Sequence, residues 1–251
     1  MSKDYGRFTW FELVTTKTDD AKRFYTETLG WKTADGPIEG MDYTLFNVGD
    51  GSVGGMMPPP DPKLPSHWLS YVSVKDVDAT AKKVVVAGGT ILADAFEVPG
   101  IGRMQPVADP KGGAFCLFAA AGDDPPALEG PGTFHWNERT TGDPKALLAF
   151  YEKVLGYTAD AMEMPNGTYW LLKNGDAMRG GLMASPTEDT PEGWLQYVAV
   201  NDVDRAVERA RKHGARIHGE LIEVPGVGRF VSLTDPVGAT IAVMKPASPQ
   251  A

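Results

Sequence analysis

Two hydrophobic periods follow one another at the start of the chain. Residues 8–15 (FTWFELVT) form a largely apolar run and predict a strand. Residues 18–29 predict a helix that opens with the polar Thr18-Asp19-Asp20 and ends at Gly30. Five of its residues recur at the spacing of one buried helix face, namely Ala21, Phe24, Tyr25, Thr28 and Leu29.

Short strands and turns account for the residues that follow. Strands are expected near 31–35, 42–48 and 52–57, and the Gly-Asp-Gly at 49–51 predicts a tight turn between the last two. The stretch 58–65 contains too many prolines to be a helix or a central strand. The order then restarts, with a strand at 68–74, a helix at 77–87 and strands near 90–97, 103–108 and 114–119.

The second half of the chain repeats the first half at a displacement of 126 residues, from Gly6–Phe118 to Gly132–Met244. About a third of the aligned positions are identical, which excludes a chance match. Residues 121–131 are rich in proline, glycine and acidic residues, as expected of a surface linker. We therefore predict one domain at 1–120, a linker at 121–131 and a second domain at 132–251.

Each copy contains the pattern βαβββ twice, so the chain holds four such modules. We expect an α+β fold in which curved, mixed or antiparallel sheets carry the helices on their outer face. The modules could pair within each copy or across the two copies, and the sequence leaves both possibilities open.

Composition and charge exclude several partners. The net charge is −9 and no run of Lys or Arg resembles a phosphate-binding stripe, so neither nucleic acid nor a membrane surface is expected as a partner. The N-terminus lacks the apolar stretch of a signal peptide, and no window reaches the ~18 apolar residues of a membrane span. We therefore expect a cytoplasmic protein. The single cysteine, Cys116, rules out an intrachain disulfide and a Cys-rich metal site.

Three short motifs occur in both copies. They are a helix end (Phe24, Tyr25, Leu29, Gly30; Phe150, Tyr151, Leu155, Gly156), a helix start (Val74, Asp76 to Asp78; Val200, Asp202 to Asp204) and a turn (Asp109, Pro110, Gly112; Asp235, Pro236, Gly238). Together they resemble the vicinal oxygen chelate superfamily, which contains glyoxalases, bleomycin-resistance proteins and extradiol dioxygenases. More narrowly, the chain looks like two-domain, actinobacterial glyoxalase-like proteins. The resemblance implies tandem glyoxalase-like domains.

In that superfamily paired modules form a cup around a divalent metal ion. The resemblance assigns the ligand positions to residues that are poor ligands: Trp10, Leu69 and Cys116 in the first copy, and Trp136, Leu195 and Ala242 in the second. Tryptophan, leucine and alanine cannot bind a metal, and one cysteine could not hold a hard, oxygen-preferring ion. None of the four histidines is expected at these positions: His67, His135, His213 and His218. We therefore expect no cofactor, with a divalent metal at a non-standard site as the less favoured alternative.

Two glutamates lie beside these positions. Because side chains alternate along a strand, Glu12 shares a face with Trp10, and Glu138 shares one with Trp136. The resemblance places that face inside the cup. Three interpretations stay open: a structural carboxylate bonded to backbone or to an arginine such as Arg103, a general base or ligand anchor with a raised pKa, or a relocated metal ligand.

Other candidates are better explained by structure than by chemistry. Glu97 and Arg103 are expected to form a salt bridge across a glycine-rich turn, as are Glu223 and Arg229 in the second copy. Cys116 is expected to be a buried thiol rather than a nucleophile. Trp68 and Trp194 are expected in the core.

The favoured function is a metal-independent, small-molecule-binding protein of the glyoxalase and bleomycin-resistance type. Its expected ligand is apolar and partly aromatic, held by Trp10, Trp136 and Cys116, with Glu12 and Glu138 as anchors or catalytic residues. The alternative is an enzyme, either a glyoxalase-like lyase or an oxygenase-type hydroxylase, that uses Glu12 or Glu138 as base or non-standard metal ligand. A third possibility is a structural or interaction module whose cups are filled by side chains. A monomer or a homodimer is expected.

Overall fold

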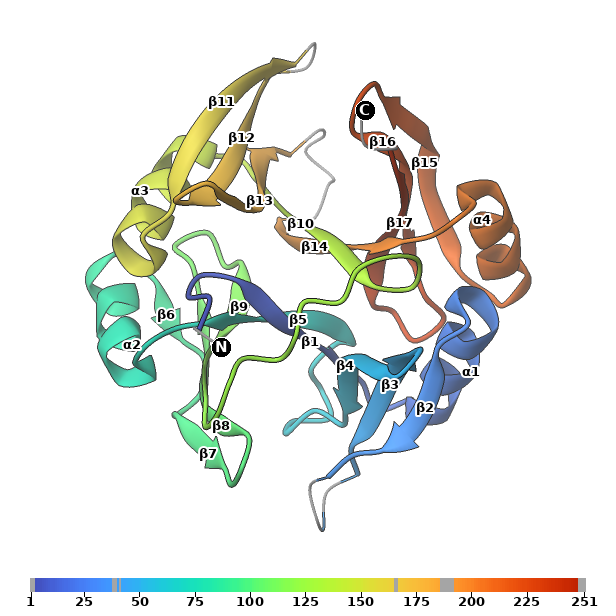
Figure 1. The fold of residues 1–251 in the computed structure, drawn as a ribbon, viewed down its shortest axis with the longest axis horizontal. Helices are drawn as coiled ribbons and strands as arrows, with labels where there is room; N and C mark the ends of the chain where they lie inside the picture. The colour runs from blue at the N-terminus through green and yellow to red at the C-terminus, as the bar shows by residue number, and fades with distance from the viewer. Residues whose placement is uncertain (1–2, 38–39, 41, 165–166, 186–191, 248–251) are drawn as a thin grey trace. The chain divides into compact units, whose positions relative to one another are not determined.

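The computed structural model describes residues 3–37, 40, 42–164, 167–185 and 192–247. Their elements follow the predicted βαβββ order (Figure 1). The first copy comprises β1 (Phe8–Val14), α1 (Thr18–Leu29), β2 (Lys32–Asp35), β3 (Thr44–Val48), β4 (Gly51–Met57), β5 (His67–Ser73), α2 (Val77–Val86), β6 (Thr90–Ile91), β7 (Phe96–Val98), β8 (Gly102–Ala108) and β9 (Ala114–Ala120). The strand predicted near 90–97 is thus split into β6 and β7.

The second copy repeats this order. It comprises β10 (Phe134–Thr141), α3 (Pro144–Leu155), β11 (Thr158–Met164), β12 (Gly167–Asn174), β13 (Ala177–Ala184), β14 (Gly193–Ala199), α4 (Val203–Lys212), β15 (Arg216–Val224), β16 (Gly228–Thr234) and β17 (Thr240–Pro246). A single strand, β15, here takes the place of β6 and β7.

Each copy forms one mixed sheet. The strand order is β2-β3-β4-β1-β5-β9-β8-β6 in the first copy, with β7 on β8, and β11-β12-β13-β10-β14-β17-β16-β15 in the second. The first strand of each module runs parallel to its last strand, as β1 does to β4 and β10 does to β13. The hairpins β2–β3 and β11–β12 are antiparallel. The sheets confirm the predicted α+β fold with mixed strand pairing.

Compactness divides the chain differently from the sequence repeat. Unit 1 comprises Met1–Trp10, Leu69–Pro126 and Trp136–Leu195, and unit 2 comprises Phe11–Trp68, Ala127–His135 and Gln196–Ala251. Each unit therefore combines one module of the first copy with one module of the second. Within unit 1, α2 lies beside α3, and within unit 2, α1 lies beside α4 (Figure 1).

The repeated helix-start motif is a pair of N-caps. The Asp76 side chain accepts a hydrogen bond from the Ala79 backbone N–H at the start of α2, and Asp202 does the same for Arg205 in α4. Such a cap satisfies a backbone donor that has no partner within the helix. Helix α1 differs from the prediction, because its N-cap position is Lys17 and makes no side-chain cap.

The other two motifs meet in the core of unit 2. The Tyr25 hydroxyl donates to Asp235 Oδ2 at 2.6 Å, and Trp68 Nε1 donates to the Tyr25 oxygen at 2.9 Å. Burial raises the pKa of Asp235, and the hydrogen bonds from Tyr25 and from nearby backbone N–H groups offset this only in part. The tyrosine of one copy therefore bonds the DPxG aspartate of the other.

Unit 1 contains the equivalent cluster with an added charge. The Tyr151 hydroxyl donates to Asp109 Oδ2 at 2.7 Å, and Trp194 Nε1 donates to the Tyr151 oxygen at 3.1 Å. Arg139, which replaces Leu13 of the first copy, also bonds Asp109, with both side chains at 0% exposure. Burial alone would raise the pKa of Asp109, but the bonds and charge of Arg139 hold it below its usual value.

The predicted salt bridge within each glycine-rich turn is wrong. Arg103 donates two hydrogen bonds to Asp78, at 3.0 and 2.7 Å, and Arg229 likewise bonds Asp204. The register places Glu97 directly opposite Arg103 in the β7–β8 ladder, yet the guanidinium reaches the helix-start motif instead. A bidentate bond to the carboxylate near the start of α2 fits the planar guanidinium and ties the turn to the helix. These arginines are therefore structural.

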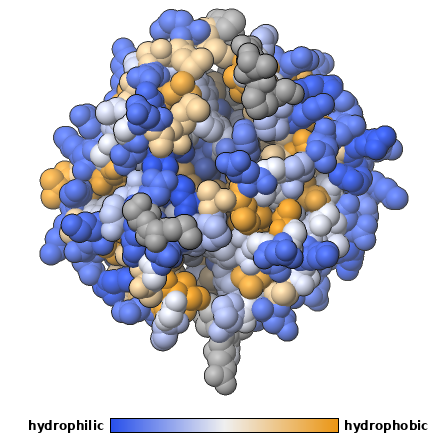
Figure 2. All heavy atoms as spheres, viewed as in Figure 1, coloured by the Kyte–Doolittle hydropathy of each residue, from blue (hydrophilic) through white to orange (hydrophobic). Residues whose placement is uncertain are grey.

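Exposed hydrophobic side chains are scattered over several elements. In Figure 2 hydrophilic residues predominate on the visible face and hydrophobic ones lie in small separate groups. The most exposed large ones are Val86 at 89% and Met178 at 61%. Single exposed side chains of this kind are normal. No helix in the described ranges has the length and apolarity to cross a membrane.

Candidate functional site

Strand β10 carries Glu138 on the face opposite Arg139. The alternation of side chains sends Arg139 to Asp109 and leaves Trp136 and Glu138 together on the other face. The parallel partner β13 places Gly181 directly opposite Glu138. Both Trp136 and Glu138 are half-buried, so this face retains contact with solvent.

A tyrosine on the next strand completes a line of hydrogen bonds. The Tyr169 hydroxyl, from β12, donates to Glu138 Oε2 at 3.0 Å. The indole Nε1 of Trp136 donates to the Tyr169 oxygen at 2.8 Å. The phenol thus bridges the indole and the carboxylate and fixes their relative orientation.

Gly181 makes this bridge possible. A Cβ atom added to Gly181 would lie 1.8 Å from the Tyr169 hydroxyl oxygen. No side chain fits at that distance, so glycine is required for the phenol to lie across β13 and reach Glu138. The parallel pairing of β10 and β13 sets this position.

The electrostatics keep Tyr169 a hydrogen-bond donor. Burial raises its pKa well above the usual value, and the negative charge of Glu138 raises it further. A neutral phenol donates its proton to the carboxylate and cannot also donate to a ligand. The Glu138 carboxylate is therefore the hydrogen-bond acceptor that this face carries beside its aromatic rings.

Methionines flank the phenol on the same face. Met162 lies opposite Tyr169 in the β11–β12 ladder, and Met183 lies opposite it in the β12–β13 ladder. Met162 is 40% exposed and Met183 is half-buried. Thioethers next to aromatic rings form an apolar, adaptable surface. We call Trp136, Glu138, Met162, Tyr169 and Met183 the second-copy face.

The first copy has the same pair of polar side chains in unit 2. The Tyr43 hydroxyl donates to Glu12 Oε2 at 2.8 Å. Gly55 lies opposite Glu12 in the β1–β4 ladder, and a Cβ there would lie 2.0 Å from the Tyr43 oxygen. Glu12 is only 3% exposed. Gly36 takes the place that Met162 has in the second copy. A Cβ atom added to Gly36 would lie 2.2 Å from Cδ1 of the Tyr43 ring.

Trp10 and Cys116 belong to an apolar cluster of unit 1. Trp10 packs against a group of buried side chains consisting of Leu69, Tyr71, Met104, Cys116, Phe118 and Ala120. Cys116 is 0% exposed and its thiol donates to the Leu117 carbonyl at 3.5 Å. The structure therefore surrounds Cys116 with apolar side chains, and its predicted role as a ligand contact stays a prediction.

The sequence pattern places both glutamates beside tryptophan but does not reveal their hydrogen-bond partners. Glu12 bonds Tyr43, and Arg103, which had been considered for it, bonds Asp78. The signal for the tyrosines was present, because Tyr43 and Tyr169 occupy the same place in the repeat. Strand alternation alone could not reveal them, since they come from a neighbouring hairpin.

The donor set does not fit a divalent metal at the positions that the resemblance implies. Those positions hold tryptophan, leucine, alanine and the buried Cys116. Within the described ranges, no group of three His, Cys, Asp or Glu side chains is placed to hold a metal ion. His67 and His218 bond the Pro65 carbonyl and the Thr234 hydroxyl instead.

Comparison with known proteins identifies the family. A model described as Glyoxalase/Bleomycin resistance protein/Dioxygenase superfamily matches residues 7–117 and 133–243. The chain belongs to this superfamily. One match falls in each sequence copy, which confirms two tandem glyoxalase domains.

Two relatives resemble the chain over nearly their whole length. The chain is 39% identical over 252 residues to "Putative glyoxylase CFP32" of Mycobacterium tuberculosis, covering 98% of this chain and 97% of that protein. It is 28% identical over 258 residues to "Anthracycline biosynthesis protein DnrV" of Streptomyces peucetius, covering 96% and 93%. The first similarity supports the predicted actinobacterial glyoxalase-like type.

Solved structures share the fold at low identity. The Mn(II)-bound glyoxalase from Novosphingobium aromaticivorans matches with a TM-score of 0.65 at 16% identity, over 96% of this chain and 81% of that chain. A catechol 2,3-dioxygenase matches with a TM-score of 0.65 at 14% identity, over 99% and 91%. At this identity the likeness extends to the fold alone.

Proposed function

We propose that the chain binds a small, planar, partly aromatic organic molecule on the second-copy face, without requiring a metal ion. The observation that carries this proposal is the line of hydrogen bonds from Trp136 through Tyr169 to Glu138. It holds two aromatic rings and one carboxylate in a fixed arrangement before any ligand arrives. Preorganisation of this kind lowers the cost of binding.

The chemistry of the face selects the ligand class. Indole and phenol rings offer apolar area and edges for ring stacking, and the thioethers of Met162 and Met183 adapt to the ligand outline. Glu138 accepts a hydrogen bond from a ligand hydroxyl or N–H group. The relative named for anthracycline biosynthesis supports a planar fused-ring ligand with hydroxyl substituents.

Metal independence is proposed because of the donor set. The positions implied by the resemblance offer no second donor beside Cys116 in the first copy and none in the second. A glyoxalase of the same fold binds Mn(II), so the proposal requires a direct measurement. Elemental analysis of the purified protein, before and after treatment with a chelator, should show no stoichiometric metal. Bound metal that is lost in Glu138→Gln would contradict the proposal.

Ligand binding is tested with a dihydroxyanthraquinone and calorimetry. Glu138→Gln should weaken binding by about 10- to 100-fold, because a charge-assisted hydrogen bond contributes about 1.5–3 kcal/mol. Trp136→Ala should weaken it through the lost stacking area. The matched control is Glu163→Gln, which removes an exposed carboxylate from β11 that bonds Thr168. No binding, or equal losses in both glutamine variants, would refute the proposal.

The same geometry favours an enzyme as the second candidate, either a lyase or an oxygenase-type hydroxylase. In the lyase, Glu138 acts as the base that takes a proton from carbon next to a carbonyl and returns it to the neighbouring carbon. The neutral phenol of Tyr169 orients that carboxylate. In the first copy Glu12, oriented by Tyr43, would have the same role. Either glutamate could instead serve as a non-standard metal ligand.

The methylglyoxal–glutathione adduct distinguishes the enzyme from the binding protein. Turnover by the wild-type protein, absent in Glu138→Gln, would establish the lyase. Turnover that survives this substitution but disappears in Glu12→Gln would move the active site to the first copy. Ligand binding without turnover supports the binding function. Trp10, Trp136 and Cys116 stay proposed ligand contacts, to be tested by the same titrations.

A further inference from the structure

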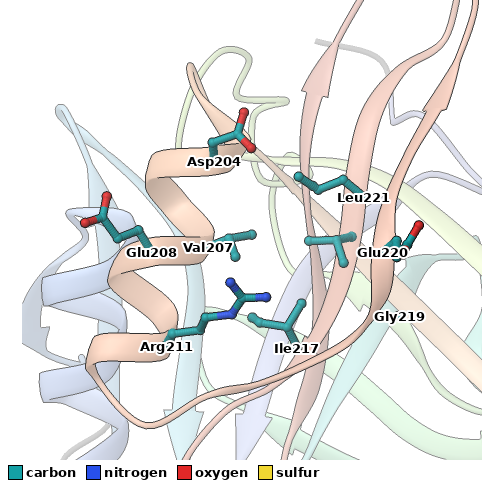
Figure 3. A pocket seen from close by; sticks show the side chains of 9 residues that line it. Asp204, Val207, Glu208, Arg211, Ile217, Gly219, Glu220 and Leu221 are labelled. Atoms are coloured by element: carbon teal, nitrogen blue, oxygen red, sulfur yellow. The ribbon is translucent and has the colours of Figure 1, made fainter.

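A pocket opens between α4 and the sheet in unit 2. None of the residues of the second-copy face lies on the helix and strands that line it. Its volume is about 390 Å³. The lining comes from α4, β15 and β16 (Figure 3) and consists of Asp204, Val207, Glu208, Arg211, Ile217, Gly219, Glu220, Leu221 and Val231.

An irregularity in β15 creates the space. The β15–β16 ladder breaks register between His218 and Ile222, and Gly219 has a φ of 70°. A Cβ built on Gly219 would meet no atom within 4 Å. Because the strand departs from its partner at this point, the gap between strand and helix is left open.

In the first copy a side chain bonds across the equivalent place. There Gln105 Nε2 donates to the Ala93 carbonyl at 3.1 Å, and Gln105 is 8% exposed. The repeat aligns Gln105 with Val231 and Ala93 with Gly219. Valine cannot make this bond, so the second copy lacks the tether and has an apolar floor in its place.

Arg211 of α4 places its guanidinium group at this apolar space. In Figure 3 the Arg211 guanidinium points from α4 toward β15, close to Val207 and Ile217. Among the described residues, the ion pairs of α4 join Arg205 to Asp202 and Arg229 to Asp204, and neither includes Arg211. The first copy has Val85 at this position.

The neighbouring carboxylates point away from Arg211 or bond another residue. Glu208 and Glu220 also line the pocket. In Figure 3 the Glu208 carboxylate points to the other side of α4 from Arg211, and the Glu220 carboxylate points away from the helix. Asp204 is already bonded by Arg229, with 3.1 Å from Nη2 to Oδ1. The pocket therefore combines an apolar floor with the Arg211 guanidinium, from which these two glutamate carboxylates point away.

We propose that this pocket binds a small organic acid with an apolar body. Its carboxylate pairs with Arg211, and its body lies on the floor formed by Val207, Ile217, Leu221 and Val231. Guanidinium and carboxylate match in a bidentate geometry, and the apolar floor favours an acid with a hydrocarbon chain over a simple inorganic anion.

Hexanoate is the probe, with hexan-1-ol and hexylamine as neutral and cationic analogues of equal chain length. Each is titrated into the full-length protein while backbone amide signals are followed by NMR. Hexanoate should shift the amides of residues 204–221, and hexan-1-ol and hexylamine should bind at least about tenfold more weakly.

Two variants test the assignment, and a third is the control. Arg211→Gln should weaken hexanoate binding by about tenfold or more, because it removes the charge-assisted bond. Val231→Gln introduces the residue of the first copy and should abolish binding by closing the gap. Arg205→Gln removes the same charge from the same helix, at a side chain that is 81% exposed and does not line the pocket. It should change affinity by less than about twofold.

Three results would overturn the proposal. They are unshifted amides in α4 and β15 at saturating hexanoate, equal losses in Arg211→Gln and Arg205→Gln, and equal binding of the alcohol and the acid. Because Arg211 is exposed, Arg211→Gln is expected to fold normally. It therefore tests the proposal even if Val231→Gln fails to fold.

Discussion

The buried ion pair of unit 1 predicts an unequal cost for removing its two partners. In Asp109→Asn, the Arg139 guanidinium stays buried at 0% exposure without a carboxylate. Leaving a buried charge unpaired costs about 3–5 kcal/mol. The asparagine side chain keeps one acceptor oxygen but no charge, so it does not recover this cost.

Arg139→Leu should cost less. Asp109 keeps the Tyr151 hydroxyl at 2.7 Å and the backbone N–H groups of Lys111 and Gly113, at 2.9 and 3.0 Å. Asp235 in unit 2 is held by such bonds without any arginine. The expected loss is about 1–3 kcal/mol, the value of hydrogen bonds to a charged group.

Urea unfolding at pH 7, followed by circular dichroism, measures both values. Asp109→Asn should lower the free energy of unfolding by about 2 kcal/mol more than Arg139→Leu, with an unchanged dependence on urea concentration. The double variant should be no less stable than Asp109→Asn, because it contains no unpaired charge. If Arg139→Leu is the more damaging change, or if the two losses add, this account of the pair is wrong.

Three further predictions concern single sites. Gly181→Ala should displace the Tyr169 hydroxyl, which lies 1.8 Å from the position of the new Cβ; quenching titrations of tryptophan fluorescence should then show weaker ligand binding, and unchanged binding would contradict the bridge. Because burial raises the pKa of Asp235, the folded state binds its proton more tightly, so stability falls as pH rises from about 3.9 through the raised value. Asp235→Asn should flatten that part of the stability profile, and a profile identical to the wild type would refute the shift. Asp202→Ala removes the N-cap of α4 and should cost about 0.5–2 kcal/mol in thermal melts, whereas no change would show that the cap contributes nothing.

The local pattern of the sequence predicted most of the helices and strands. The stripe that predicted residues 18–29 as a helix matches α1, and Gly30 ends it with a φ of 74°. The segment 90–97 was less well predicted, because its residues pair with β8 in two separate pieces. Alternation along β10 placed Trp136 and Glu138 on one face, and the structure agrees.

Contacts between distant residues could not be obtained in this way. The partner of Glu138 comes from β12, and the partner of Arg139 comes from the other sequence copy. Arg103 was assigned to a neighbour in sequence, yet it bonds Asp78, 25 residues away. Each of these depends on which strand or helix lies alongside, and one sequence contains no direct record of that.

The sequence by itself determined the repeat, the fold class, the family resemblance and the two glutamates beside tryptophan. These follow from periodicity and from matched residues, which are local properties of the chain. Only the tertiary structure decided that each compact unit takes one module from each copy, that Tyr43 and Tyr169 bond the glutamates, and that Val231 lines a pocket where the equivalent Gln105 bonds the backbone. The physical reason is that packing brings together side chains that are far apart in the chain. A glycine on one strand, for example, leaves room for the tyrosine ring of a neighbouring strand.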